Sequence, residues 1–258
     1  MPSWMPRPGK VGTPDAVAGW VKVIPLIKST IDFYFTEIRD NREKECQQLI
    51  VRENNRGTKP KKDADAKKYA GQNTDYYICD TEYVKGKARY DLAGVKWPST
   101  SNARRKTSGL RLALMELKFG KDALQEGKSG IVDHVRDLNK FLADKAAVRN
   151  LKEELVSIFR QKVELSLIDA PQGFAGFSED KPEFILLLAN LHPRSSILEK
   201  QLAKLEDLEY FPLGHKAEIR IATSNFMGYG LFEESIYSLA DFRQRFQKQI
   251  YAEGQAAD

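Results

Sequence analysis

The chain has 258 residues, of which 41% are apolar, so it can bury a substantial core within one elaborated α/β domain. It carries 41 Lys and Arg against 36 Asp and Glu, a net charge of +5, and no apolar run reaches the length of a membrane span. Two distant cysteines exclude a disulfide framework, and without a secretory signal pattern we expect a cytoplasmic protein.

Irregular sequence is expected at both ends of a single folded domain. Residues 1–26 are assigned to an N-terminal arm whose beginning is rich in proline, and residues 251–258 to a small, polar tail that we expect to fray. Residues 27–250 form the domain between them. Its first predicted element is a helix over residues 27–50, which carries an apolar stripe at helical spacing.

Three strands are predicted next, because short apolar runs are bounded by turn-forming residues. They cover Tyr76 to Val84, Ala88 to Trp97 and Leu110 to Phe119. The later predicted elements are a helix from Ile131 to Ala143, a strongly apolar strand from Glu183 to Leu191, a helix from Ser196 to Leu208 and a strand from Ala217 to Ser224. This order predicts an α/β fold.

The second and third strands form a predicted hairpin that carries the most informative residues. If Trp97 faces Leu110, the ladder keeps one register and Asp91 falls directly opposite Glu116. Opposed side chains lie roughly 4.5–5.5 Å apart at Cβ, close enough to share one cation. Strand alternation puts Lys118 on the face of Glu116. Because opposed like charges destabilise a sheet, a divalent metal is the natural neutralising partner.

The alternative interpretation is an ordinary solvated pair, since Glu-x-Lys occurs by chance in many proteins. The surrounding strand argues against it, because Leu112, Ala113 and Leu114 indicate burial on both faces. Because an unpaired charge is costly to bury, charged residues at the end of a buried strand indicate a structural or functional partner.

Two further features near the hairpin stay open. A two-residue turn before the second strand would set Asp80 opposite Asp91, whereas a three-residue turn would set Thr81 there. His134 and Asp137 lie three residues apart on the following helix and could face the site. A lone histidine on an amphipathic helix is more often structural.

An acidic residue ending one strand and Glu-x-Lys ending the next resemble the PD-(D/E)XK nuclease superfamily, which has the restriction-endonuclease-like fold. The resemblance covers residues 27–224 and implies a helix, three antiparallel strands, a second helix and a strand parallel to the centre. We therefore expect a restriction-endonuclease-like core, with a central mixed β-sheet flanked by helices. The chain departs from the family pattern at Tyr90, which stands where the pattern has proline.

The resemblance also implies roles for individual residues. Asp91 and Glu116 would hold Mg²⁺ or Mn²⁺, the backbone carbonyl of Leu117 would be a further ligand, and Lys118 would be the catalytic lysine. Glu45 on the first helix is a weaker candidate ligand, and its alternative is a solvated helix charge. The implied activity is metal-dependent hydrolysis of phosphodiester bonds, foremost in DNA. The alternative is a catalytically inactive nucleic-acid-binding or regulatory module with the same fold.

Basic residues are concentrated around this motif. Residues 52–128 hold 18 basic and 10 acidic side chains, an excess that a phosphate-rich polymer would require. Basic loops are also commonly only solubilising. We expect nucleic acid, foremost DNA, as the partner and no membrane, and a homodimer stays open without an interface signal. The candidate nucleic-acid contacts are Arg56, Lys61, Lys62, Arg104, Arg105 and Lys106.

Overall fold

In a computed structural model of the protein, the described residues are 42–56, 74–85, 88–124, 130–170, 173–206, 216–223 and 228–246. Contacts divide the chain into two units, Met1–Glu45 and Cys46–Asp258, and the fold below is that of the second unit. The expected arm, the expected tail, residues 27–41 of the first helix and the candidate contacts Lys61 and Lys62 lie outside the described residues.

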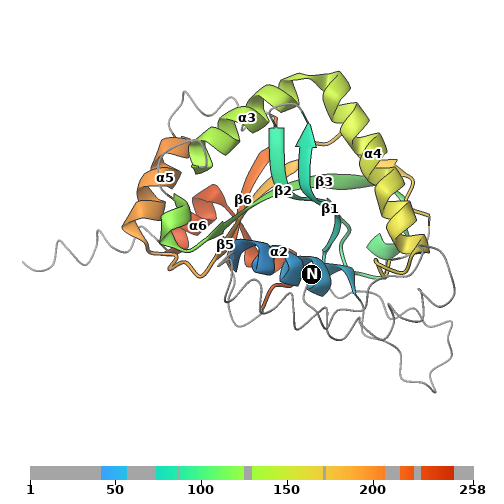
Figure 1. The fold of residues 1–258 in the computed structure, drawn as a ribbon, viewed down its shortest axis with the longest axis horizontal. Coiled ribbons are helices and arrows are strands. Elements are labelled where there is room, and N and C mark those ends of the chain that lie inside the picture. The colour runs from blue at the N-terminus through green and yellow to red at the C-terminus, as the bar shows by residue number, and fades with distance from the viewer. Residues whose placement is uncertain are drawn as a thin grey trace, which may run out of the picture. The chain divides into compact units, whose positions relative to one another are not determined.

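Helices and strands are interspersed along the described chain (Figure 1). The α-helices are α2 (Arg42–Asn55), α3 (Ile131–Ala143), α4 (Lys145–Glu164), α5 (Ser196–Glu206) and α6 (Leu239–Phe246). The strands are β1 (Tyr76–Lys85), β2 (Ala88–Lys96), β3 (Ser108–Phe119), β4 (Gly176–Phe177), β5 (Glu183–Ala189), β6 (Glu218–Thr223) and β7 (Ile236–Ser238). Short 3-10 helices are η2 (Ala103–Arg105), η3 (Lys121–Leu124) and η5 (Glu233–Ser235).

The strands form one mixed sheet in the order β1-β2-β3-β5-β6-β7, and β4 pairs with β3 off this path. β2 is antiparallel to both β1 and β3. β3, β5 and β6 run parallel to one another, and β7 is antiparallel to β6. Parallel neighbours need long crossovers, which here contain α3 and α4 between β3 and β5, and α5 between β5 and β6. The predicted α/β class and the central mixed sheet flanked by helices are confirmed.

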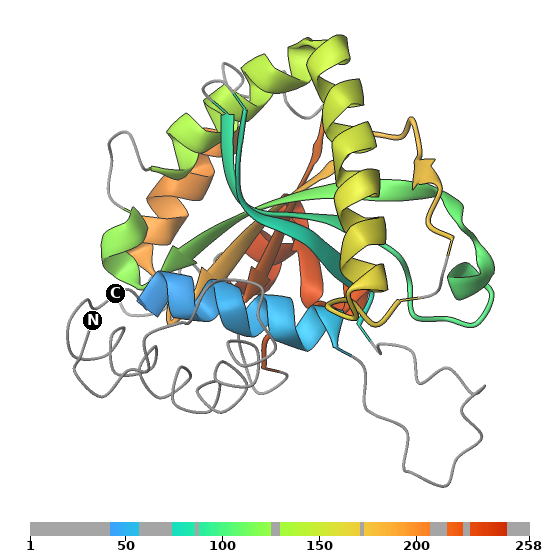
Figure 2. The same cartoon turned by 45° about the vertical axis from the view of Figure 1, so that its right-hand side comes forward.

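Different helices cover the two faces of the sheet (Figures 1 and 2). One face packs on α3, α4 and α5, and Leu112 and Leu114 of β3 point to it. The other face packs on α2 through Cys46 and Ile50, and Met115 of β3 points there. β3 and β5 therefore carry apolar side chains on both faces, as central strands of a covered sheet do.

The register between β2 and β3 is the one that the sequence predicts. Paired residues run from Lys96 and Arg111 to Leu92 and Met115 without a shift. The symmetric hairpin therefore predicted the register correctly. The register matters because a slip by one residue would turn every side chain to the other face of the sheet.

The register between β1 and β2 differs from both predicted alternatives. The last residue of β1, Lys85, pairs with the first residue of β2, Ala88, so the pairing is shifted along β1 relative to both alternatives. This register sets Glu82 across from Asp91, so Asp80 and Thr81 were both wrong. A register shift between Ile78 and Asp80 changes the pairing again further along β1.

The predicted element boundaries agree with the structure to within a few residues where they are described. The helix over residues 131–143 is confirmed at both ends, whereas the described part of the first helix continues to Asn55. Sequence analysis missed α4, β4, β7 and α6. In α4, the buried residues Leu151, Leu155 and Phe159 recur every four positions, which is the helical signal that was overlooked.

Two expectations about protein class can be compared with the described residues. Among these residues, no helix combines the length and the apolar character that crossing a membrane needs. Cys46 and Cys79 are both buried, and neither forms a disulfide.

The end of α2 is attached to the edge strand β1 by one buried amide. The Asn55 side chain donates a hydrogen bond to the Ile78 carbonyl at 2.8 Å and accepts one from the Ile78 N–H at 2.8 Å. Asn55 thus pairs with Ile78 as a neighbouring strand would, beside the register shift in β1. Both backbone groups would otherwise be buried without a partner, which is costly.

We predict that Asn55→Ala lowers the free energy of unfolding by about 2–4 kcal/mol, because two buried backbone groups lose their hydrogen bonds. Urea unfolding followed by circular dichroism measures the change. Gln48→Ala is the matched control, since Gln48 is an exposed amide of the same helix, and it should stay within about 0.5 kcal/mol of wild type. Equal effects of the two substitutions would contradict the prediction.

Candidate active site

The candidate site lies where β2 and β3 separate. Their ladder ends at the pair Leu92 and Met115. Beyond it, β2 pairs only with β1, while β3 continues beside β5 as far as Phe119. Asp91 and Glu116 are the first residues past the last pair, so their side chains stand at the branch between the β1–β2 hairpin and the parallel strands.

Asp91 occupies the gap that this separation leaves. Its Oδ2 accepts a hydrogen bond of 2.8 Å from the Leu117 N–H, which a continued ladder would have bonded to β2. A residue in a strand directs its N–H and its C=O toward the same neighbour. The Leu117 carbonyl, the predicted backbone ligand, therefore faces the same edge of β3 as the Asp91 carboxylate.

Glu116 and Lys118 lie next to each other on the α3 side of β3, as strand alternation predicts. Lys118 Nζ is 2.7 Å from Glu116 Oε1. Asp91, Glu116 and Lys118 expose only 6%, 3% and 4% of their surfaces. Glu116 and Lys118 of β3 are thus buried as a pair, and Asp91 of β2 is buried at the same branch, where each unpaired charge would be strongly unfavourable.

His134 of α3 completes this group. Its Nε2 lies 3.0 Å from the same Glu116 oxygen that Lys118 contacts. From the sequence, His134 and Asp137 were both candidates to face the site. Of these two residues, only His134 contacts Glu116 in the structure. Asp137 instead forms an ion pair with Lys140 one turn along the helix surface.

The β1–β2 hairpin adds an exposed ion pair beside the buried group. Arg89 donates a hydrogen bond to Glu82. This bond and the Glu82 charge raise the pKa of Arg89, with smaller contributions of the same sign from Asp91 and Glu116. Arg89 therefore interacts electrostatically with both site carboxylates, and the sequence did not reveal it because its place depends on the β1–β2 register.

Tyr90, the residue before Asp91, anchors the hairpin to α3. Its ring packs edge-on against Phe141 with centroids 5.8 Å apart. Burial raises the pKa of the Tyr90 hydroxyl, and the neighbouring acidic groups add to this effect. Tyr90 therefore packs this part of β2 against α3.

The candidate metal donors are the Asp91 and Glu116 carboxylates and the Leu117 carbonyl. Among the described residues, no group of three or more His, Cys, Asp and Glu side chains could hold an ion. A closed zinc or calcium site made only of side chains is therefore not formed by these residues. Two carboxylates and the Leu117 carbonyl still fit Mg²⁺ or Mn²⁺, because Mg²⁺ is usually held by one or two carboxylates together with water and substrate phosphate oxygens.

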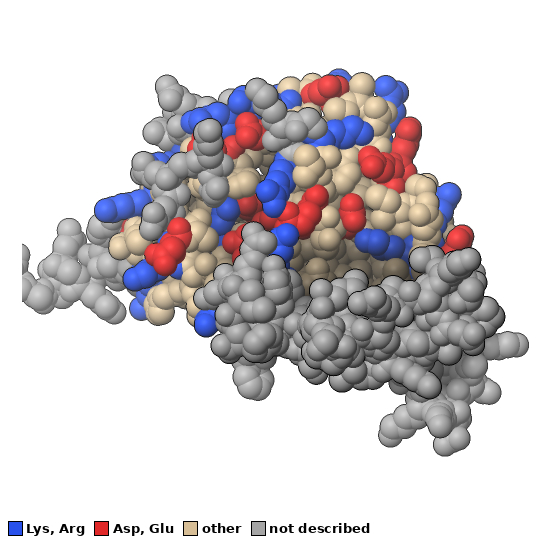
Figure 3. All heavy atoms as spheres, in the orientation of Figure 1, with Lys and Arg blue, Asp and Glu red and all other residues tan. Residues whose placement is uncertain are grey.

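The other predicted site residues lie elsewhere. Glu45 is an exposed residue in the first turn of α2. Arg56, Arg105 and Lys106 are exposed, as a nucleic-acid contact requires. Arg104 is turned inward, with Nη2 2.5 Å from the Thr74 carbonyl and its guanidinium 4.7 Å from the Tyr77 ring centroid. Figure 3 shows acidic and basic side chains interspersed over the visible face of the described residues.

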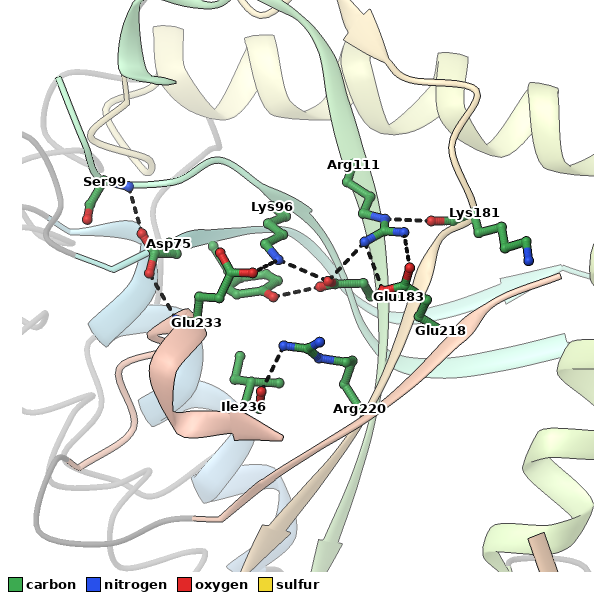
Figure 4. Close-up of polar contacts among 11 residues, drawn as sticks. Asp75, Lys96, Ser99, Arg111, Lys181, Glu183, Glu218, Arg220, Glu233 and Ile236 are labelled. Carbon is green, nitrogen blue, oxygen red and sulfur yellow. Dashed lines mark hydrogen bonds and ion pairs between the residues drawn. The ribbon is translucent and has the colours of Figure 1, made fainter. Parts of the chain in front are cut away.

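A second buried charge cluster surrounds Glu183 at the amino end of β5 (Figure 4). Glu183 is fully buried and accepts hydrogen bonds from Tyr76 Oη at 2.6 Å, Lys96 Nζ at 3.0 Å and Arg111 Nη1 at 3.4 Å. Burial, and then the Glu183 charge, raises the pKa of Tyr76. Sequence analysis missed this cluster, although a glutamate that opens an apolar strand was a visible signal.

The Glu183 cluster extends outward through two further ion pairs. Lys96 Nζ also lies 2.6 Å from Glu233, and Arg111 forms two hydrogen bonds with Glu218 at 2.6 and 3.0 Å. The contacts join β2, β3, β5, β6 and η5, with the acidic groups met by cations from neighbouring strands. This arrangement holds the sheet together at the end opposite to Glu116 and Lys118.

Comparison of the chain with protein-family models, with curated proteins and with solved structures finds no match.

We predict that Lys118→Met lowers the free energy of unfolding by about 3–5 kcal/mol, because it leaves the Glu116 charge buried without its cation. The double variant Glu116→Gln and Lys118→Met should lose much less than the sum of the two single variants, since it removes both charges. The coupling energy from urea unfolding should exceed about 1 kcal/mol.

The exposed pair Asp137 and Lys140 is the matched control for this cycle. Asp137→Asn with Lys140→Met should couple by less than about 0.5 kcal/mol, because exposed ion pairs contribute little. Additive effects of the Glu116 and Lys118 substitutions would contradict the buried pair.

Glu218 should make the protein more sensitive to acid. The hydrogen bonds from Arg111 hold the pKa of Glu218 below its ordinary value of 4.5. This stabilisation is present above that value and is lost as the pH falls through the lowered, folded-state value. Glu218→Gln should therefore show a shallower loss of stability than wild type below pH 4.5.

Urea unfolding at several values from about pH 7 to about pH 3 measures this difference. Glu153→Gln, on the exposed surface of α4, controls for the loss of one carboxylate. A pH profile of Glu218→Gln that matches wild type would contradict the role of the Arg111 pair.

Proposed function

We propose that the protein is a metal-dependent nuclease that hydrolyses phosphodiester bonds, foremost in DNA. The observation that carries the proposal is the burial of Asp91, Glu116 and Lys118 together at the branch between β2 and β3. Glu116 and Lys118 also lie toward the carboxyl end of β3, which runs parallel to β5. Ligands of open α/β sheets commonly bind beyond the carboxyl ends of the parallel strands.

Asp91, Glu116 and the Leu117 carbonyl would hold Mg²⁺ or Mn²⁺. When bound, the ion would polarise a phosphoryl oxygen and lower the pKa of a water molecule. Lys118 Nζ is held by Glu116, so its charge is fixed where it can orient the attacking water or offset the charge that develops on the phosphate. His134 fixes the orientation of the Glu116 carboxylate from α3.

The order of elements supports a restriction-endonuclease-like core. α2 precedes the antiparallel strands β1, β2 and β3, α3 follows them, and β5 then runs parallel to β3. α5 and the parallel strand β6 extend this order. The fold would place the two carboxylates and the lysine as the PD-(D/E)XK pattern requires.

One observation favours the alternative of a nucleic-acid-binding or regulatory module without turnover. Lys118 and His134 both contact Glu116 Oε1, so the Glu116 charge is already neutralised within the protein. A site of this kind could stabilise the fold while other residues bind nucleic acid. This alternative predicts salt-dependent binding that survives the loss of Glu116 and no metal-dependent cleavage.

We predict that purified protein cleaves DNA in the presence of Mg²⁺ or Mn²⁺ and that EDTA abolishes cleavage. Asp91→Ala and Lys118→Ala should each lower the rate by at least about 100-fold, because each removes a group that acts on the scissile phosphate. Gel assays with plasmid DNA, linear DNA and RNA measure the rate and the preferred substrate.

Glu153→Ala and Lys200→Ala are the charge-matched controls, since both side chains are exposed on α4 and α5. They should cleave at the wild-type rate. Absence of cleavage by wild type, or cleavage that Asp91→Ala and Lys118→Ala leave unchanged, would overturn the proposed nuclease activity.

A further inference from the structure

A basic cleft lies beside the first two turns of α4, apart from the candidate active site. Its volume is about 570 Å³, and none of its lining residues belongs to the group around Glu116. Five cations line it, against two acidic residues. The charged lining residues are Lys145, Arg149, Lys152, Lys181, Lys216, Glu179 and Asp180.

The five cations come from three segments that are distant from one another in the sequence. Lys145, Arg149 and Lys152 lie on one side of α4 at helical spacing, with Val148 between them. Lys181 precedes β5, and Lys216 precedes β6. Figure 4 shows the Lys181 side chain extending away from the Glu183 cluster. The cations are therefore gathered by the tertiary structure, since the chain contains no basic run that includes all of them.

The position of these cations is only partly compensated within α4 itself. The N-cap Asp144 accepts a hydrogen bond from the Ala147 N–H, but the first turn of α4 contains no acidic residue and begins with Lys145. Cations near a helix N-terminus oppose the helix dipole, and like charges four residues apart repel each other. Among the described residues, neither Lys145 nor Arg149 forms an ion pair that would offset this cost. A bound anion would relieve both effects.

Lys152 is fixed at the wall of the cleft. Its Nζ donates a hydrogen bond of 2.7 Å to the Ser178 carbonyl, and its side chain is only 13% exposed. Its other contact, at 3.5 Å, is with Glu179, which is 97% exposed and therefore well hydrated. The cleft thus combines one preorganised cation with the exposed Lys145, Arg149 and Lys181. Its apolar surface comes from Leu142, Val148 and Pro182.

We propose that this cleft binds phosphate groups of a nucleic-acid strand, as a second contact beside the Asp91, Glu116 and Lys118 site. The inference rests on the proposed function for the identity of the polymer. α3 connects the two places, with His134 near its start and Leu142 near its end. Eight residues of helix span about 12 Å, a distance that a strand of a few nucleotides covers.

The test uses the full chain carrying Asp91→Ala, in buffer with EDTA, so that binding is measured without cleavage. Fluorescence anisotropy with labelled single-stranded and duplex DNA gives the affinity at several salt concentrations. Lys145→Ala with Arg149→Ala should weaken binding about 10-fold and should reduce the slope of log K against log salt by about 1 to 2, because two phosphate contacts are lost.

The matched control is Lys140→Ala with Lys200→Ala, which removes two exposed cations from α3 and α5. It should lower the affinity and the slope far less. Thermal unfolding without DNA checks the fold, and the cleft variant should be at least as stable as its parent, since the removed cations oppose the α4 dipole.

Equal effects of the cleft and control variants would overturn the proposal, as would absence of DNA binding by the parent. ATP binding that depends on Lys145 and Arg149, without a matching effect on DNA, would also overturn it and indicate a small phosphate ligand. Failure of the proposed nuclease is a distinct result, because wild type would then bind DNA through the cleft and leave it uncleaved.

Discussion

The separation of β2 from β3 is the constraint on which the candidate site depends. A continuous ladder would have used the Leu117 backbone for pairing and would have left no place for a carboxylate. Because β2 departs, the Leu117 N–H needs another acceptor, and an unpaired buried N–H costs about 1–3 kcal/mol. Asp91 supplies that acceptor. The same hydrogen bond ties the Asp91 carboxylate to the backbone of the residue between Glu116 and Lys118.

Buried carboxylates at the two ends of the parallel strands have different sets of partners. At the amino end, Glu183 accepts hydrogen bonds from a tyrosine, a lysine and an arginine, and the surrounding ion pairs extend to the surface. Toward the carboxyl end, Lys118 and His134 share one oxygen of Glu116. The contacts of Glu183 join strands across the sheet. The contacts of Lys118 and His134 are both with Oε1 of Glu116, so Oε2 of Glu116 takes no part in them.

Sequence patterns predicted those helices and strands whose apolar residues recur with a clear helical or strand period. The apolar runs of β3 and β5 and the amphipathic α3 were read close to their bounds, because burial on two faces or on one face leaves a direct trace in the sequence. The weaker pattern of α4 was missed. Its buried stripe is narrow and most of its surface is charged, so the helix depends on packing against the sheet more than on composition.

The sequence by itself determined the α/β class, the register of the β2–β3 hairpin and the shared face of Glu116 and Lys118. These features depend on strand alternation and a symmetric hairpin, which act over short separations along the chain. Only the tertiary structure decided that His134 contacts Glu116, that Glu82 faces Asp91, that Arg104 turns inward and that Glu183 is the centre of a buried cluster. Each of these depends on how distant segments pack or how a turn closes, and no spacing in the sequence carries that information.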